Sequence, residues 1–187
     1  MTDSRTRLID LLRDLSFQKK RVILASGRES DFFIDCKQTI LTAEGHALVG
    51  ELMFEALNEL AGPGPVEAVG GVELGGCPLA SAVSLVSFQK GRPLPALYVR
   101  KERKDHGSAK RIEGDRALRP GLRVALLEDV VTTGGSSLKA LDVLREAGCE
   151  VAGIVALVDR LEGGREAIEA AGVKLITLAT RRDFLPD

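Results

Sequence analysis

The sequence predicts a single α/β domain built on a mainly parallel sheet. Its 187 residues are enough for one domain with a substantial core. Beyond residue 66, short apolar runs alternate with helix-like segments, and runs such as "RVALLEDVV" (123–131) show no polar alternation. Uninterrupted apolar strands separated by helices are typical of a parallel sheet that is covered on both faces.

The N-terminal part predicts a small attachment to this sheet. Residues 4–15 place leucine and isoleucine at helical spacing, which indicates an amphipathic helix. Residues 21–41 mix β-branched and aromatic residues around a Ser-Gly turn, so we expect short strands joined by a loop. A long helix is expected over 42–62, with Thr42 as its cap and Gly62 at its end.

The break "GPGP" at 62–65 separates this part from the alternating pattern. We expect one domain over residues 1–187, with an N-terminal hood mainly at 1–41 and a core at about 42–187. The strands expected in the core are 66–71, 94–100, 123–131, 150–160 and 173–179, and the helices are 77–91, 136–148 and 164–172.

Composition narrows the classes of protein to consider. The net charge of −1 does not imply general nucleic-acid binding, and no apolar run is long enough to span a bilayer. The first residues alternate charge with leucine, unlike a signal peptide. Three widely spaced cysteines and two histidines without HExxH spacing favour reduced thiols and no dedicated zinc site. A cytoplasmic protein that binds neither membrane nor nucleic acid is therefore expected.

The segment "LLEDVVTTGGSSL" (126–138) predicts a sugar-phosphate site. Glu128 and Asp129 fall where a strand ends, which is where ligands bind in open α/β sheets. Residues 132–136 then lead into a helix whose N-terminal N–H groups suit a phosphate, with glycines that let the backbone close around it. The carboxylates would accept hydrogen bonds from ribose hydroxyls. The alternative is an ordinary turn with solvated acids and serines that cap the helix.

The segment "YVRKERKDHGSAKRIEG" (98–114) carries six Lys or Arg residues and His106 against three acids. Its charge and glycines predict a mobile surface loop over about 100–119 rather than a packed element. Three interpretations are open: a solvated hairpin, a nucleic-acid patch, or a lid that brings cations to a diphosphate leaving group.

Both segments resemble a known family. "VALLEDVVTTGGSS" is similar to the phosphoribosyl-diphosphate signature of type I phosphoribosyltransferases, and "RKERKDHG" resembles the catalytic loop of orotate phosphoribosyltransferases. "ASGRESDFFIDCK" (25–37) resembles the segment of that family that covers orotate, and "GGVELGGCPLA" (70–80) its diphosphate loop. "LVDR" (157–160) matches a strand end whose arginine binds the orotate carboxylate in that family.

The resemblance implies the type I fold with its hood, a Mg²⁺ cofactor held mainly by substrate and water, and a homodimer with active sites shared between subunits. The implied catalytic residues are Lys101, Lys104, His106 and Asp129. The implied contacts to phosphoribosyl diphosphate are Arg100, Lys101, Lys104, His106, Glu128, Asp129, Val130, Val131, Thr132, Thr133, Gly134, Gly135 and Ser136. The implied contacts to orotate are Thr132, Arg160, Phe32 and Phe33.

Some of these residues have a structural alternative, and the chain departs from the family at two positions. Arg160 could pair with Glu162 on the surface, and the two phenylalanines could belong to the core. Ala25 and Gly75 stand where some bacterial members have lysine, so those contacts do not carry over. Lys37 is a candidate replacement, or else a surface lysine.

The implied reaction transfers the 5-phosphoribosyl group from phosphoribosyl diphosphate to N1 of orotate, as in de novo pyrimidine (UMP) biosynthesis. The carbon under attack would gain oxocarbenium character, so catalysis would rest on positioning and electrostatics. Two rivals are kept: a purine phosphoribosyltransferase, and a regulator that senses phosphoribosyl diphosphate without catalysis.

Overall fold

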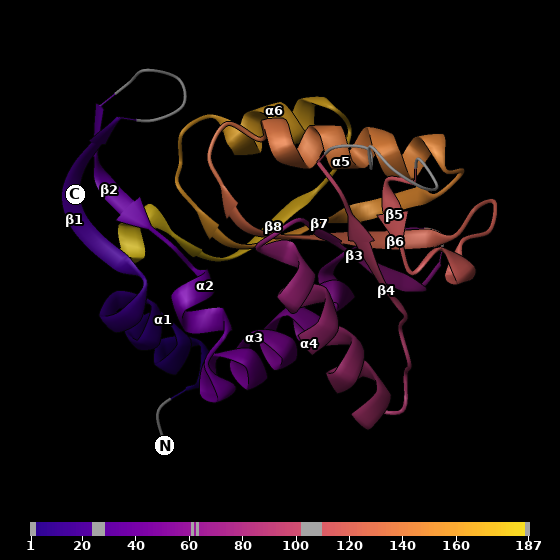
Figure 1. Cartoon of the computed structure of the whole chain (residues 1–187), viewed down its shortest axis with the longest axis horizontal. Coiled ribbons are helices and arrows are strands. Elements are labelled where there is room, and N and C mark those ends of the chain that lie inside the picture. The colour runs from indigo at the N-terminus through magenta and orange to yellow at the C-terminus, as the bar shows by residue number, and fades with distance from the viewer. Residues whose placement is uncertain (1–2, 24–28, 61, 63, 102–109, 186–187) are drawn as a thin grey trace.

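A six-stranded sheet forms the centre of the computed structural model, which describes residues 3–23, 29–60, 62, 64–101 and 110–185. Its strand order is β5-β4-β3-β6-β7-β8, and all neighbours pair in parallel except β5, which runs antiparallel to β4 (Figure 1). The mainly parallel α/β sheet predicted from the sequence is confirmed. The strands are β3 Ala68–Val72, β4 Ala96–Val99, β5 Ile112–Glu113, β6 Arg123–Val131, β7 Glu150–Asp159 and β8 Leu175–Thr180.

Helices cover both faces of this sheet, with α3 and α4 on one side and α5 and α6 on the other (Figure 1). Adjacent residues of β6 explain why the strand is apolar throughout: Leu127 packs into the core under α3 and α4, while Leu126 packs into the core under α5. The helices are α1 Ser4–Leu15, α2 Lys37–Ile40, α3 Ala43–Ala56, α4 Gly76–Gln89, α5 Gly135–Glu146 and α6 Gly164–Ala170, with short 3-10 turns η1 Leu57–Glu59, η2 Asp115–Ala117 and η3 Arg181–Asp183.

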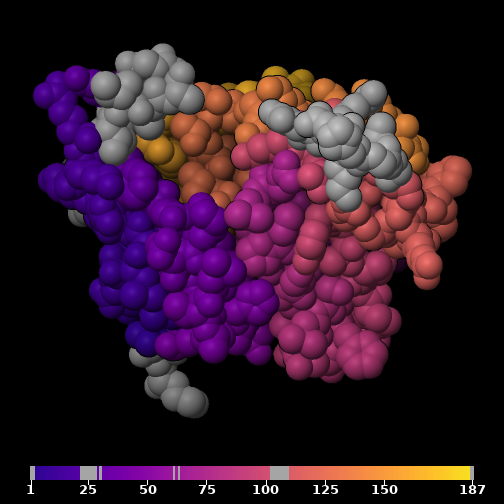
Figure 2. Space-filling view, viewed as in Figure 1, coloured from indigo at the N-terminus to yellow at the C-terminus, as the bar shows by residue number. Residues whose placement is uncertain are grey.

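The N-terminal attachment contains a separate antiparallel pair, β1 Phe17–Ile23 and β2 Glu29–Ile34. Three phenylalanine rings join it to the C-terminal end of the chain: Phe32 lies 5.2 Å from Phe17 and 5.7 Å from Phe184 between ring centroids. In the space-filling view, the indigo and violet N-terminal segments form one side of the molecule beside the magenta surface of α4 (Figure 2).

Two N-terminal expectations were wrong in part. Residues 37–40 form α2 rather than strand, because the Asp35 carboxylate accepts from the Lys37 N–H at 3.3 Å and from the Gln38 side chain at 3.1 Å and so turns the chain. The long helix begins after Thr42, whose hydroxyl accepts from the Gly45 N–H at 3.0 Å as predicted. It ends before Gly62, because Leu60 leaves helical geometry and packs into the core.

The charged segment is also more ordered than predicted where the structure describes it. Residues 112–117 form β5 and η2, and the buried Ile112 pairs with Val99 of β4. The expectation of an unpacked loop over all of 100–119 was therefore wrong for these residues, while 102–109 lie outside the described part. No helix within the described ranges is long and apolar enough to cross a membrane.

Candidate active site

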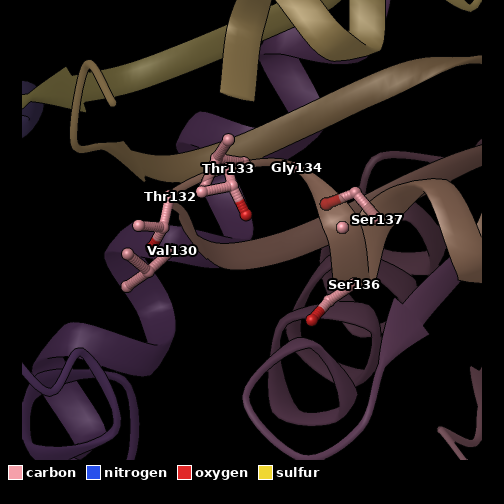
Figure 3. A pocket seen from close by; sticks show the side chains of 8 residues that line it. Val130, Thr132, Thr133, Gly134, Ser136 and Ser137 are labelled. Carbon is pink, nitrogen blue, oxygen red and sulfur yellow. The ribbon is translucent and has the colours of Figure 1, made fainter. Parts of the chain in front are cut away.

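The loop after β6 encloses a small cavity at the carboxyl edge of the sheet. The cavity measures about 80 Å³, and the side chains of Thr132, Thr133, Ser136 and Ser137 surround it (Figure 3). Gly134 takes the left-handed conformation, with φ of 80°, and starts α5 directly behind the loop. No side chain caps α5 at Gly134, and Gly135, Ser136 and Ser137 of its first turn line the cavity, so the N-terminal turn of the helix can offer N–H donors to a bound phosphate.

Glu128 is held inside the protein rather than solvated. Its side chain belongs to a residue that is only 5% exposed, and the Ser137 hydroxyl donates to its Oε2 at 3.0 Å. The turn alternative, with solvated acids and a serine that caps the helix, is therefore wrong for these two residues. Ser137 was not among the predicted site residues, although it directly follows the predicted loop.

Burial raises the pKa of Glu128, and the negative charge of Asp129 and a hydrogen bond between the two carboxyls raise it as well, so that it reaches about 8 in total. The hydrogen bond from Ser137 and the positive charge of Lys101 act in the opposite direction. The acid pair therefore carries a proton near neutral pH when no ligand is present, and the Lys101 ammonium acts on it electrostatically.

This titration predicts a pH-dependent stability. Because the folded pKa of Glu128 is raised above the ordinary value of 4.5, its contribution is fully present below that pH and is lost as pH rises toward about 8. We expect the unfolding free energy of the ligand-free protein to fall over this window, by at most about 1.4 kcal/mol per pH unit from this one group. Urea unfolding at several pH values between 4.5 and about 8 measures it, and Glu128→Gln should flatten the slope. Parallel curves for the two proteins would contradict the prediction.

Asp129 links this loop to the turn after β3. A Cβ atom added at Gly75 would overlap the Asp129 carboxylate, so glycine lets that carboxylate lie directly against the turn. The lysine that some family members have at this position would require Asp129 to move. The glycine that this chain has in place of that lysine is therefore explained by the position of the Asp129 carboxylate.

Two predicted cations lie at the end of the neighbouring strand β4. Arg100 forms an ion pair with Glu113 at 3.3 Å, and the Lys101 side chain is exposed. Both line a cavity of about 210 Å³ together with Arg111, Lys139 and Ser136. The cationic cavity therefore adjoins the phosphate loop. The predicted residues Lys104 and His106 lie outside the described residues.

Arg160 directly follows β7, the strand that pairs with β6 on the side away from β3. Its guanidinium pairs with Glu162 Oε1 at 2.9 Å and donates to the Phe32 carbonyl oxygen at 3.0 Å. The ion pair proposed as the alternative does exist, but it is buried rather than on the surface: the two side chains are 9% and 13% exposed.

The two phenylalanines differ in their environment. The Phe32 ring is fully buried in the aromatic cluster, so this side chain belongs to the core. Phe33 is half-buried, and the Lys20 ammonium lies 3.9 Å from its ring centroid. Lys37 pairs with Asp35 at 2.5 Å, and the charge of Asp129 also contributes to raising its pKa, after the Asp35 hydrogen bond and charge. Ala25 lies outside the described residues.

Comparison with known proteins decides the family. Residues 38–179 match the phosphoribosyl transferase domain. The chain is 70% identical over 183 residues to an orotate phosphoribosyltransferase of Sorangium cellulosum, covering 98% of this chain and 94% of that protein. This chain belongs to the orotate phosphoribosyltransferase family.

Solved structures of the family agree with this fold. An orotate phosphoribosyltransferase of Mycobacterium tuberculosis in complex with 5-phospho-alpha-D-ribosyl 1-diphosphate is 35% identical with a TM-score of 0.78, over 97% of this chain and 99% of that one. An adenine phosphoribosyltransferase of Leishmania donovani, at 18% identity and a TM-score of 0.68 over 98% of this chain and 84% of that one, shares the fold.

Proposed function

We propose that this chain transfers the 5-phosphoribosyl group from phosphoribosyl diphosphate to N1 of orotate and releases diphosphate. The observation that carries the proposal is the acid pair of Glu128 and Asp129, held between the glycine loop and the exposed Lys101 at one edge of the sheet. A sugar phosphate needs these three chemistries together: N–H donors for its phosphate, acceptors for its hydroxyls, and a cation near its leaving group.

Each part has a role in this proposal. The loop residues Thr132, Thr133, Gly134, Gly135 and Ser136, with the backbone of Val130 and Val131, hold the 5′-phosphate. Glu128 and Asp129 accept from the ribose hydroxyls. Asp129 also faces the anomeric carbon as positive charge develops there, and Arg100 and Lys101 stabilise the departing diphosphate. By family resemblance, Lys104 and His106 join them.

Orotate is a carboxylate, which suits the guanidinium at the end of β7. Glu162 and the Phe32 carbonyl orient Arg160, which fixes the position from which its planar guanidinium would meet a planar anion. In this proposal Thr132 orients the base from the loop. Phe32 contributes through its backbone and Phe33 through its half-buried ring.

Magnesium fits the donor set of this site. The acid pair offers the oxygen chemistry that this hard cation prefers, yet no group of three or more His, Cys, Asp or Glu side chains gathers among the residues that the structure describes. We therefore propose that substrate oxygens and water supply most ligands, with the acid pair nearby. When bound, the ion neutralises charge on the diphosphate.

We further propose that the chain acts as a homodimer with shared sites. The exposed apolar surface along α4 supports this: Leu41 and Leu85 line one shared cavity and are 69% and 56% exposed, and Phe88, one turn further along α4, is 72% exposed. Apolar patches of this kind mark protein–protein contacts. A cytoplasmic location stays a prediction.

The two rivals fit the site less well. A purine base carries no carboxylate for the Arg160 guanidinium to recognise. A regulator that only senses phosphoribosyl diphosphate needs no cation such as Lys101 beside the acid pair, and the net charge of −1 does not favour nucleic acid.

Orotate consumption tests the proposal directly. Purified protein with phosphoribosyl diphosphate and Mg²⁺ should deplete orotate, followed by its ultraviolet absorbance, and EDTA should stop the reaction. Adenine and hypoxanthine in place of orotate serve as controls. If orotate is stable while phosphoribosyl diphosphate still binds, the base assignment is wrong, and consumption of a purine would replace it.

A further inference from the structure

The backbone of Lys101 is held from two sides by side chains of other segments. Its N–H donates to Glu73 Oε1 at 2.7 Å. Its carbonyl oxygen accepts from the Arg111 guanidinium at 3.2 Å. The Lys101 side chain is exposed and takes part in neither contact, so both fix where the side chain starts rather than what it binds.

The position of Glu73 explains how it reaches Lys101. Glu73 follows β3, and its N–H donates to the Val99 carbonyl at 2.9 Å, so the pairing of β3 with β4 extends to this residue. Its side chain then crosses to the first residue beyond Arg100. A carboxylate that accepts from a backbone N–H forms a short, charge-assisted hydrogen bond, which is stronger than a neutral one.

An acid is unexpected at this place. Glu73 begins the turn that leads to Gly75, against which the Asp129 carboxylate lies, and this turn resembles a diphosphate-binding loop. A further negative charge there repels an anionic substrate. The hydrogen bond from the Lys101 N–H gives Glu73 a role that offsets this repulsion.

We propose that Glu73 is a positioning residue for Lys101, assisted by Arg111. The inference rests on the proposed function, in which Lys101 stabilises the departing diphosphate. Glu73 fixes the point at which the chain leaves β4. Arg111, the residue directly before β5, holds the same point from the other side, and its carbonyl also accepts from the Arg100 N–H at 2.9 Å. Because its N–H and its carbonyl oxygen are both held, the Lys101 backbone is fixed, and the side chain starts from a defined point near the acid pair.

Kinetics of two variants test this role. Glu73→Ala should lower kcat by about 10-fold, because a cation displaced by about 1 Å stabilises the transition state less, while KM for orotate stays within about twofold. Glu73→Gln keeps an acceptor oxygen and should restore most of the loss. Glu67→Ala is the matched control and should leave kcat unchanged. Glu67 also accepts from a backbone N–H, that of Arg123 at 3.1 Å, but it precedes β3, whereas Glu73 follows it.

A double variant separates this role from a merely structural one. In a Lys101→Ala background, Glu73→Ala should produce no further loss of kcat, since no ammonium remains to be positioned. An equal loss in both backgrounds, or an unchanged kcat in the single variant, would overturn the proposal. Amide hydrogen exchange of Lys101 tests the contact without any turnover: protection should drop in Glu73→Ala and persist in Glu73→Gln. If wild type consumes no orotate, the proposed function fails, and this exchange measurement still decides whether Glu73 holds Lys101.

Discussion

Replacing Lys101 with alanine should lower kcat by about 10²- to 10³-fold, the usual effect of removing one preorganised group that stabilises transition-state charge. The ammonium acts on the acid pair at the end of β6 and lines the cationic cavity beside the phosphate loop. Its charge matters most when negative charge builds on the leaving diphosphate. The side chain is exposed, so the unfolding free energy should change by less than about 0.5 kcal/mol.

Steady-state kinetics and urea unfolding of the same preparations measure both effects. Lys90→Ala is the matched control, because Lys90 is an exposed lysine at the far end of α4. It should leave both kcat and stability unchanged. Parallel losses of activity and of folding in the Lys101 variant would mean that this lysine supports the structure, and the assignment of a catalytic role would then be abandoned.

The fold was predictable from the sequence wherever burial on both faces decides the structure. Strand β6 spans the predicted residues 123–131, because an apolar run with cores on both sides leaves no alternative placement. Helix α2 and strand β5 were missed because both are short and depend on tertiary partners. The first follows a turn closed by Asp35, and the second is a two-residue edge strand paired to β4.

The site was predictable in its composition but not in its geometry. The acid pair and glycine loop are contiguous in the chain, so their spacing alone placed them together. Glu128 is buried by the surrounding strands and by Ser137, and the local sequence pattern gives no sign of this burial. The contact from Glu73 to Lys101 joins residues 28 positions apart. Phe32 packs on Phe184 from the opposite end of the chain, which no local pattern reveals.

Replacing Arg160 with lysine should raise KM for orotate by roughly 10- to 100-fold, the range expected when hydrogen bonds to a charged group are lost. Lysine keeps the charge but not the planar pair of N–H donors that matches a carboxylate. The affinity for phosphoribosyl diphosphate should stay within about twofold, because Arg160 contacts the strand before the phosphate loop through its backbone: its N–H donates to the Val131 carbonyl at 3.0 Å, and lysine keeps that contact. Steady-state kinetics in orotate and titration with phosphoribosyl diphosphate measure the two effects.

Arg160 also has a structural role that this experiment must separate. Its guanidinium holds the Phe32 carbonyl and pairs with Glu162, so the variant should lose stability as well, and urea unfolding will show by how much. Arg145→Lys, at an exposed position in the last turn of α5, is the matched control and should change neither KM. A specific rise in KM for orotate at unchanged phosphoribosyl-diphosphate affinity supports base recognition by Arg160. If the binding of both substrates weakens equally, Arg160 only supports the fold around the site, and another residue must bind the orotate carboxylate.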